Sequence, residues 1–290
     1  MPLPQTPAGL SELAQDYDAI LCDVWGVIHN GRNAFAAACA ALERYRAERG
    51  PVVLISNAPR PSDALHGQLS GYGVPRTAWT TFVTSGDATR PLLAELAPGP
   101  VWTIGPRDRD GPLYDGLGLQ FVDGPEDAAF IACTGPDDEE TEQAEDYRAR
   151  LQTAVGRGLK FICANPDRVV QKGDRLIPCA GAIADLYEDL GGWSVRAGKP
   201  NAPIYELAVK QAQVALGKPI DRSRVLCIGD GVGTDVRGAQ AQGLDCLFLW
   251  GGIHAAELSH EAGPGAAGPV GDFLDGHATT AKYAMPELVW

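Results

Sequence analysis

Several features are missing from this chain, and each absence excludes a class of protein. No apolar run approaches the ~18 residues needed to span a bilayer, and the N-terminus lacks a basic start followed by an apolar stretch. We therefore expect a cytoplasmic protein without a membrane partner. Lys and Arg number only 24 against 37 Asp and Glu, a formal net charge of −13. Because nucleic-acid affinity comes mainly from cations that neutralise phosphates, no nucleic-acid partner is expected.

Paired cysteine motifs are missing as well. The seven cysteines are odd in number, include no C-x-x-C pattern, and in several cases lie inside apolar runs. An odd count without metal-ligand spacing argues against a disulfide framework or a zinc site. We predict reduced, buried thiols that pack as small hydrophobic side chains.

What the chain does contain is a series of short apolar runs bounded by Gly, Pro, Asp and Asn. The runs are AILCDV (19–24), VVLIS (52–56), KFICAN (160–165), RVLCIGD (224–230) and DCLFLW (245–250). Continuous rather than alternating apolarity is typical of strands covered on both faces. Segments with helical spacing lie among them at 34–50, 61–73 and 201–217. The patterns predict an α/β fold with a doubly wound, Rossmann-like parallel sheet.

The length of the chain favours two lobes. Domains of roughly 100 to 200 residues are usual, and this chain has 290 residues with 45% hydrophobic content. Its middle carries further strand candidates at 101–105 and 130–134. We predict a core formed by residues 1–85 and 196–290, and an inserted α/β domain formed by residues 86–195.

Polar residues follow three of the predicted strands. Asp23 comes after AILC, Ser56 and Asn57 come after VVLI, and Asp230 comes after VLCIG. In doubly wound sheets, ligands bind in a crevice at the carboxyl ends of the strands. We therefore expect these side chains to meet at one edge of the sheet, although a single Asp at a strand end can equally be a cap or a turn former.

The glycine-rich stretch GDGVGTD (229–235) adds Asp235 to Asp230. Hard carboxylate ligands on such a loop suit Mg²⁺, which keeps waters and substrate phosphate as its other ligands. Lys199 lies just before a predicted helix, where it would pair with an anion drawn to the helix N-terminus. With the hydroxyl of Ser56, these groups form an electrostatic clamp for a phosphoryl group, with Asp23 placed to attack it.

The order of these motifs resembles a known family. D-x-x-G (Asp23 to Gly26), S-N (Ser56 and Asn57), G-K-P (198–200) and G-D-x-x-x-x-D (229–235) are similar to the four motifs of the haloacid dehalogenase (HAD) superfamily. The long insertion, the SNAPR form and ANPDRVV (164–170) resemble its NagD-like class IIA branch, mostly phosphatases with a C2-type α/β cap. DVWGVIHNG resembles a bacterial subgroup of that branch.

The resemblance implies roles for individual residues. Asp23 would attack phosphorus to form an aspartyl-phosphate, while Ser56 hydrogen-bonds the transferring group and Lys199 holds Asp23 and the phosphate together. Asn57, from the same motif as Ser56, is a candidate substrate-binding residue. The expected substrate is a small phosphorylated metabolite of unspecified identity.

The resemblance also implies a magnesium site. Its protein ligands would be Asp23, Asp230 and the backbone carbonyl of Trp25, with Asp235 as a ligand or as a partner of one. Because Trp25 would bind through its main chain, its unusual side chain leaves this site intact.

The side chain of Trp25 departs from the family pattern. Family phosphatases carry a second Asp here, which protonates the leaving group and activates the attacking water, whereas an indole N–H cannot exchange a proton near neutral pH. His29 could substitute, or the substrate could have a good leaving group. Alternatives are a hydrolase acting at carbon, as in the dehalogenases, or a non-catalytic protein that binds a phosphorylated ligand.

In the predicted cap, three residues are tentative contributors to the substrate pocket. Asn165 and Asp167 belong to an Asn-Pro-Asp segment that can equally be an ordinary turn, and Gly181 either permits close approach of a ligand or begins a packed helix. For the oligomeric state, a closed symmetric homodimer is the default expectation.

Overall fold

The computed structural model describes residues 2–172, 175–258 and 267–290, and every statement below concerns these residues. The chain divides into two compact units. The first contains Met1–Ser56, His66–Val83 and Tyr205–Trp290, and the second contains Asn57–Leu65 and Thr84–Ile204. Within the described ranges, no helix is both long and apolar enough to cross a membrane.

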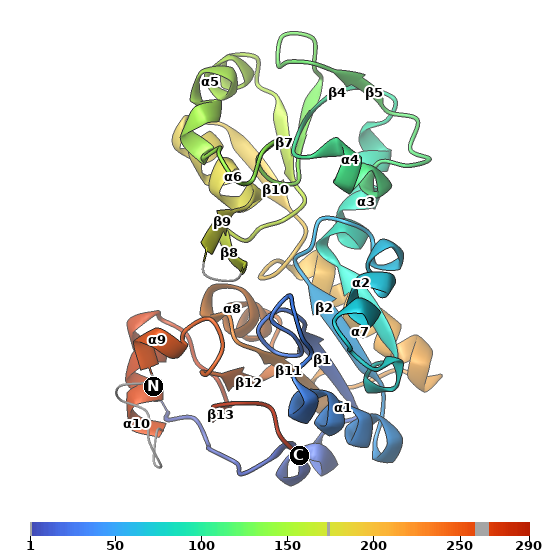
Figure 1. Cartoon of the computed structure of the whole chain (residues 1–290), viewed down its shortest axis with the longest axis vertical. Coiled ribbons are helices and arrows are strands. Elements are labelled where there is room, and N and C mark those ends of the chain that lie inside the picture. The colour runs from blue at the N-terminus through green and yellow to red at the C-terminus, as the bar shows by residue number, and fades with distance from the viewer. Residues whose placement is uncertain (1, 173–174, 259–266) are drawn as a thin grey trace. The chain divides into compact units, whose positions relative to one another are not determined.

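A six-stranded sheet forms the centre of the first unit, with the order β13-β12-β11-β1-β2-β3 (Figure 1). Its strands are β1 (Ala19–Asp23), β2 (Val52–Ser56), β3 (Thr81–Thr84), β11 (Val225–Gly229), β12 (Asp245–Leu249) and β13 (Tyr283–Met285). Each pairing from β13 to β2 is parallel. Every residue of β1 and β11 is buried, as continuous apolarity predicts for strands covered on both faces.

Helices connect the strands of this sheet, so the predicted α/β, doubly wound class is confirmed. They are α1 (Ala36–Glu48), α2 (His66–Gly71), α7 (Ala202–Leu216), α8 (Arg237–Ala241), α9 (Ala255–Leu258) and α10 (Ala267–Gly276). Short 3₁₀ turns occur at η1 (Leu10–Glu12), η2 (Ala14–Asp16), η4 (Arg76–Ala78) and η7 (Arg222–Arg224), and a π-helical turn, η8, spans Val232–Val236.

The second unit is built on its own sheet, with the order β10-β7-β6-β4-β5 and parallel pairing throughout. Its strands are β4 (Pro100–Ile104), β5 (Gln120–Val122), β6 (Phe130–Cys133), β7 (Lys160–Cys163) and β10 (Trp193–Arg196). Its helices are α3 (Ser85–Leu96), α4 (Arg107–Asp110), α5 (Arg148–Gly156) and α6 (Ala180–Asp189), with 3₁₀ turns at η3 (Ser62–Leu65), η5 (Gly111–Leu113) and η6 (Ala144–Tyr147).

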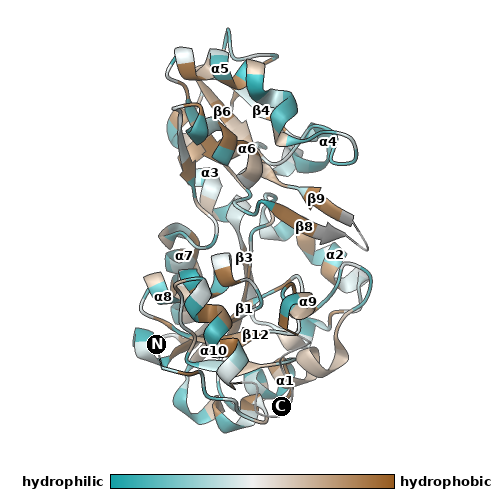
Figure 2. Ribbon diagram, turned by 90° about the vertical axis from the view of Figure 1, so that its left-hand side faces the viewer, coloured by the Kyte–Doolittle hydropathy of each residue, from teal (hydrophilic) through white to brown (hydrophobic). Residues whose placement is uncertain are grey.

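Alternate residues of β6 enter two different hydrophobic clusters of this unit. Ile131 and Cys133 belong to one cluster, and Phe130 and Ala132 to the other, so both faces of the sheet are covered. An antiparallel hairpin, β8 (Val169–Lys172) and β9 (Arg175–Pro178), lies outside the sheet. Half of the residues in these two strands are hydrophobic, their ribbon is partly brown in Figure 2, and Leu176 is exposed.

The seven cysteines are all buried and form no disulfide, in agreement with the sequence. Burial raises the pKa of Cys39 to about 11 and that of Cys163 to about 12, so these thiols stay protonated near neutral pH. Since the thiolate is the reactive form, these two cysteines serve packing rather than chemistry.

Candidate active site

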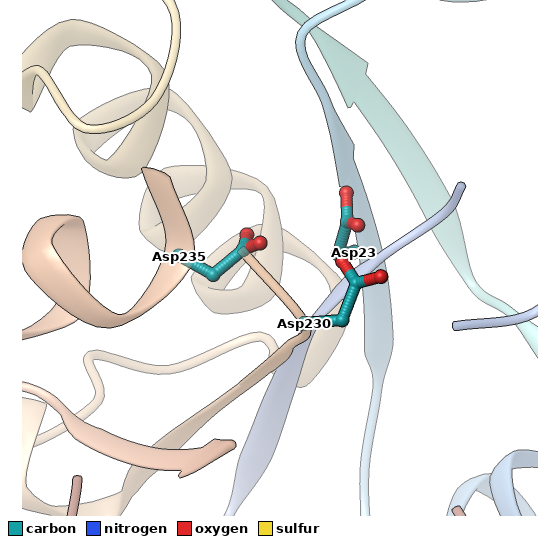
Figure 3. Close-up of side chains that lie close together, drawn as sticks. All are labelled: Asp23, Asp230 and Asp235. Atoms are coloured by element: carbon teal, nitrogen blue, oxygen red, sulfur yellow. The ribbon is translucent and has the colours of Figure 1, made fainter. Parts of the chain in front are cut away.

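The side chains of Asp23, Asp230 and Asp235 converge in the first unit (Figure 3). Each offers a carboxylate oxygen within 4.8 Å of the others, and all three residues are buried. Asp23 ends β1, and Asp230 directly follows β11, the parallel neighbour of β1. Because parallel neighbours end at the same edge of a sheet, these two carboxylates meet there. Asp235 joins them from the π-helical turn η8.

The carboxylate of Asp230 lies so close to the backbone of two glycines that neither position has room for a side chain. A Cβ atom at Gly26 or at Gly252 would lie 2.1 Å from Asp230 Oδ2. Gly26 also has a φ of +83°, a left-handed conformation that favours glycine. The Ile253 amide donates a hydrogen bond to the same oxygen at 2.9 Å. Close approach of this carboxylate therefore explains both glycines.

Asp235 is held by contacts within and around its own loop. Gly231 N donates to Asp235 Oδ2 at 3.1 Å, and a Cβ atom at Gly229 would lie 2.2 Å from Asp235 Cγ. From α7, the Tyr205 hydroxyl donates to the carbonyl oxygen of Thr234 at 3.2 Å. The glycine-rich loop is therefore shaped around its carboxylates.

This donor set fits a hard divalent cation. Three buried carboxylates this close together repel one another unless protons or a cation compensate their charge. All three offer oxygen, and neither nitrogen nor sulfur belongs to the cluster, which disfavours softer transition metals. Asp23, Asp230 and Asp235 are therefore suited to hold a hard divalent cation.

Ser56 reaches the same edge of the first sheet. It ends β2, the other neighbour of β1, and is partly exposed. Since Asp23 is in register with Ile55, Ser56 lies one residue farther along its strand toward the carboxyl edge. Of three adjacent strands, β1 and β2 thus end in a polar residue and β11 is followed by one.

In the second unit, the side chain of Asn57 joins two distant segments. Its Nδ2 donates to Asp167 Oδ1 at 2.8 Å and to the Lys199 carbonyl at 3.1 Å, while its Oδ1 accepts from Lys199 N at 2.7 Å. The buried amide therefore fixes the backbone of Lys199. This structural role differs from the substrate contact predicted for Asn57.

Lys199 itself is buried, 3% exposed, and follows a tightly packed glycine. A Cβ atom at Gly198 would lie 2.6 Å from both Asn57 Oδ1 and Ser85 Oγ, which explains the glycine of the G-K-P motif. The sequence analysis did not identify Ser85, the first residue of α3. A signal was present, because Thr84 ends β3 and Ser85 follows it, just as Ser56 ends β2 and Asn57 follows it.

Asn165 and Gly181 are engaged with the protein's own backbone. Asn165 Oδ1 accepts from Asp167 N at 3.1 Å, which forms an Asx turn. Gly181 N donates to the carbonyl of Asp167 at 3.0 Å, and a Cβ atom there would lie 2.2 Å from the Pro166 oxygen. These contacts fit an ordinary turn at Asn165 and a packed helix start at Gly181, and the substrate-binding roles stay predictions.

The indole of Trp25 is packed onto its own loop. Its ring meets that of His29 edge to face, with centroids 5.3 Å apart and an interplanar angle of 77°. On another side, a Cβ atom at Gly31 would lie 2.3 Å from Trp25 Cη2. The partly exposed indole is therefore held in place by a glycine and a histidine that follow it within six residues.

His29 is buried beneath this indole and is poorly suited to replace the missing acid. Its Nδ1 accepts a hydrogen bond from Gly31 N at 3.0 Å, and its ring lies 4.7 Å from that of Tyr72. Burial lowers the pKa of His29 to about 4, so the imidazole is neutral near neutral pH and cannot donate a proton as an imidazolium there. His29 therefore contributes to the packing of this loop, and its catalytic role stays a prediction.

Replacing Gly31 by alanine should destabilise the protein more than the same change at Gly73. Both glycines have left-handed backbones, with φ of +77° and +85°, so each alanine costs about 1 to 2 kcal/mol. Nothing lies within 4 Å of a Cβ atom at Gly73, whereas the new methyl group at Gly31 meets the indole of Trp25. Steric overlap should add about 1 to 3 kcal/mol at Gly31 only. Urea unfolding measures the difference, and equal losses would show that the indole yields freely.

The fold and the acidic cluster together define a class of protein. The sheet is doubly wound, carboxylates lie at the carboxyl ends of adjacent central strands, and a second α/β unit is inserted in sequence. This architecture is typical of α/β proteins that bind a ligand at the strand ends. Residues 20–118 match the family model described as haloacid dehalogenase-like hydrolase, and residues 196–274 match a second HAD-hydrolase-like model. The chain therefore belongs to the haloacid dehalogenase-like hydrolase family.

Known structures and curated proteins support this assignment. A hydrolase of the haloacid dehalogenase-like family from Brucella suis 1330 is 45% identical, covers 98% of this chain and 100% of its own, and has a TM-score of 0.86. D-glycerol 3-phosphate phosphatase of Mycobacterium tuberculosis is 27% identical over 85% of this chain and 67% of its own length. NagD from E. coli K-12, at 21% identity over 93% of this chain and 96% of its own, has a TM-score of 0.68 and shares the fold. The predicted similarity to NagD-like phosphatases is thus confirmed.

Proposed function

We propose that this protein is a Mg²⁺-dependent phosphatase of small phosphorylated metabolites that works through an aspartyl-phosphate on Asp23. The observation that carries the proposal is the buried cluster of Asp23, Asp230 and Asp235 at the strand ends, next in the sheet to Ser56. Relatives add support, because the M. tuberculosis protein is named a phosphatase and its structures are described as complexes with calcium and with magnesium.

In the proposed reaction, a carboxylate oxygen of Asp23 attacks phosphorus, and the bond from phosphorus to the ester oxygen breaks. The leaving group departs with the electron pair of that bond. The Ser56 hydroxyl donates to a phosphoryl oxygen, and the Lys199 ammonium compensates negative charge on the same group. Asp23, Asp230, Asp235 and the carbonyl oxygen of Trp25 would hold the metal ion. When bound, the ion would stabilise negative charge on the phosphoryl oxygens.

The second half of the reaction is hydrolysis of the aspartyl-phosphate. Water attacks phosphorus, the bond to the Asp23 oxygen breaks, and phosphate leaves with the carboxylate regenerated. Both halves benefit from a group that moves a proton, typically by ~10² to 10⁴ in rate. The indole of Trp25 exchanges no proton, and the pKa of His29 is lowered to about 4 by burial. Turnover should therefore favour substrates whose leaving group needs no protonation.

The second unit would act as the cap of this enzyme. We propose that residues 86–195, a C2-type α/β cap inserted into the core, contact the part of the substrate that leaves. The hydrogen-bonded trio of Asn57, Asp167 and Lys199 would keep the lysine backbone in a fixed position within that unit.

A metal-dependent phosphatase screen tests this proposal. We expect the protein to hydrolyse acyl and aryl phosphates with Mg²⁺ and to lose the activity with EDTA. Turnover of alkyl phosphates should be lower by on the order of 10² or more, because alkoxide leaving groups need an acid. Colorimetric detection of released phosphate measures each rate.

Two other outcomes would point to different functions. Halide release from a haloacid, without turnover of any phosphate, would favour chemistry at carbon and overturn the phosphatase proposal. Tight binding of a phosphorylated compound without turnover would favour a ligand-binding protein, in which the Trp25 loop marks lost catalysis.

A further inference from the structure

His254 contacts the acidic loop from outside the cluster that defines the active site. It follows β12 by five residues, and its side chain is 18% exposed. One ring nitrogen, Nδ1, lies 2.9 Å from Glu257 Oε1, and the other, Nε2, accepts from Val232 N at 3.5 Å. Val232 lies between Asp230 and Asp235 in sequence, so this histidine holds the loop that carries two of the three carboxylates.

The two contacts of His254 select one tautomer of the ring. A carboxylate accepts hydrogen bonds and a backbone amide donates them, so Nδ1 carries the proton and Nε2 presents its lone pair to Val232. Glu257, one helical turn farther along α9, thereby orients the imidazole. The ring is further enclosed by Phe273, whose centroid lies 5.1 Å away.

The residue before His254 contacts the same loop on its other side. Ile253 N donates to Asp230 Oδ2 at 2.9 Å, while the adjacent amide of the acidic loop, Gly231 N, donates to Asp235 Oδ2 at 3.1 Å. Ile253, through its backbone, therefore holds Asp230, and His254, through its side chain, holds the peptide between Gly231 and Val232. These contacts restrain the carboxylate of Asp230 and the start of the loop that leads to Asp235.

We propose that His254, oriented by Glu257, is a positioning residue that sets the geometry of the acidic loop and thereby its affinity for a divalent cation. The proposal rests on the metal site of the proposed function. Residues that orient metal ligands without touching the metal typically change affinity by ~10- to 100-fold when replaced. His254 meets this description through hydrogen bonds alone, since it is not among the three residues that offer a ligand atom to the described cluster.

Calorimetric titration of the metal-free full chain with Mg²⁺ tests the proposal without relying on activity. His254→Ala should weaken Mg²⁺ binding by about 10-fold or more. His254→Gln should restore most of the affinity, because its amide oxygen can accept from Val232 N. Recovery with glutamine would separate the hydrogen bond from a general loss of packing.

His277→Ala is the matched control. His277 belongs to the same aromatic cluster, with its ring 4.5 Å from that of Phe273, but its Nδ1 faces the Phe273 carbonyl rather than the acidic loop. The affinity of the His277→Ala variant for Mg²⁺ should equal that of the wild-type protein. A loss in His277→Ala as large as in His254→Ala, or wild-type affinity in His254→Ala, would overturn the positioning role. Absence of Mg²⁺ binding by the wild-type chain would instead overturn the proposed metal site itself.

Discussion

Replacing Asp23 by asparagine should abolish turnover of acyl and aryl phosphates and leave the fold intact. The amide has nearly the same shape as the carboxylate, but it is a poor nucleophile and carries no charge. Loss of a nucleophile costs on the order of 10⁴-fold or more in kcat. Measurement of released phosphate under saturating Mg²⁺ gives the rate, and circular dichroism checks the fold.

Asp18→Asn provides the control for this change. Asp18 lies just before β1, and its Oδ1 is 2.7 Å from Arg224 Nη2, an ion pair at the surface whose guanidinium lowers the pKa of the carboxyl group. Because surface ion pairs contribute little, its loss should leave turnover within about twofold of the wild type. Asp23→Asn retaining a tenth or more of wild-type turnover would show that another group attacks phosphorus.

Parts of this site follow from the sequence because local rules determine them. Asp23, Ser56 and Asp230 each end or follow a continuous apolar run, and the strand order then brings them to one edge. The runs at 19–24, 52–56 and 224–230 coincide with β1, β2 and β11 to within one residue at each end. By contrast, β3 and β10 carry only two apolar residues each and β13 has only three residues, so these strands do not stand out.

Other features depend on contacts that no local pattern records. The burial of His29 comes partly from Tyr72, which is 43 positions away. Asn57 has a structural role because Lys199, 142 positions away, offers it both a donor and an acceptor. No sequence motif marks His254, and only the fold brings its ring to the amide of Val232.

The unusual Trp25 suggests a second large effect: Trp25→Asp should raise kcat for alkyl phosphates. The new carboxyl group would supply the proton that the leaving alkoxide needs and would then activate the water that cleaves the aspartyl-phosphate. A positioned acid or base is worth ~10² to 10⁴ in rate, and the gain should be smaller for aryl phosphates, whose leaving groups need less help. Released phosphate measures kcat for both substrate classes.

Trp25→Asn separates proton transfer from the loss of the indole. Both variants remove the ring that packs against His29 and Gly31, so both relax the loop to the same extent, but only aspartate exchanges a proton. A gain in Trp25→Asp that is absent in Trp25→Asn identifies the missing acid as the limit on turnover. Trp25 both stands in place of the acid and orders the loop in which an acid would have to lie. Equal rates in the two variants would therefore mean that the conformation of this loop, rather than proton transfer, limits turnover.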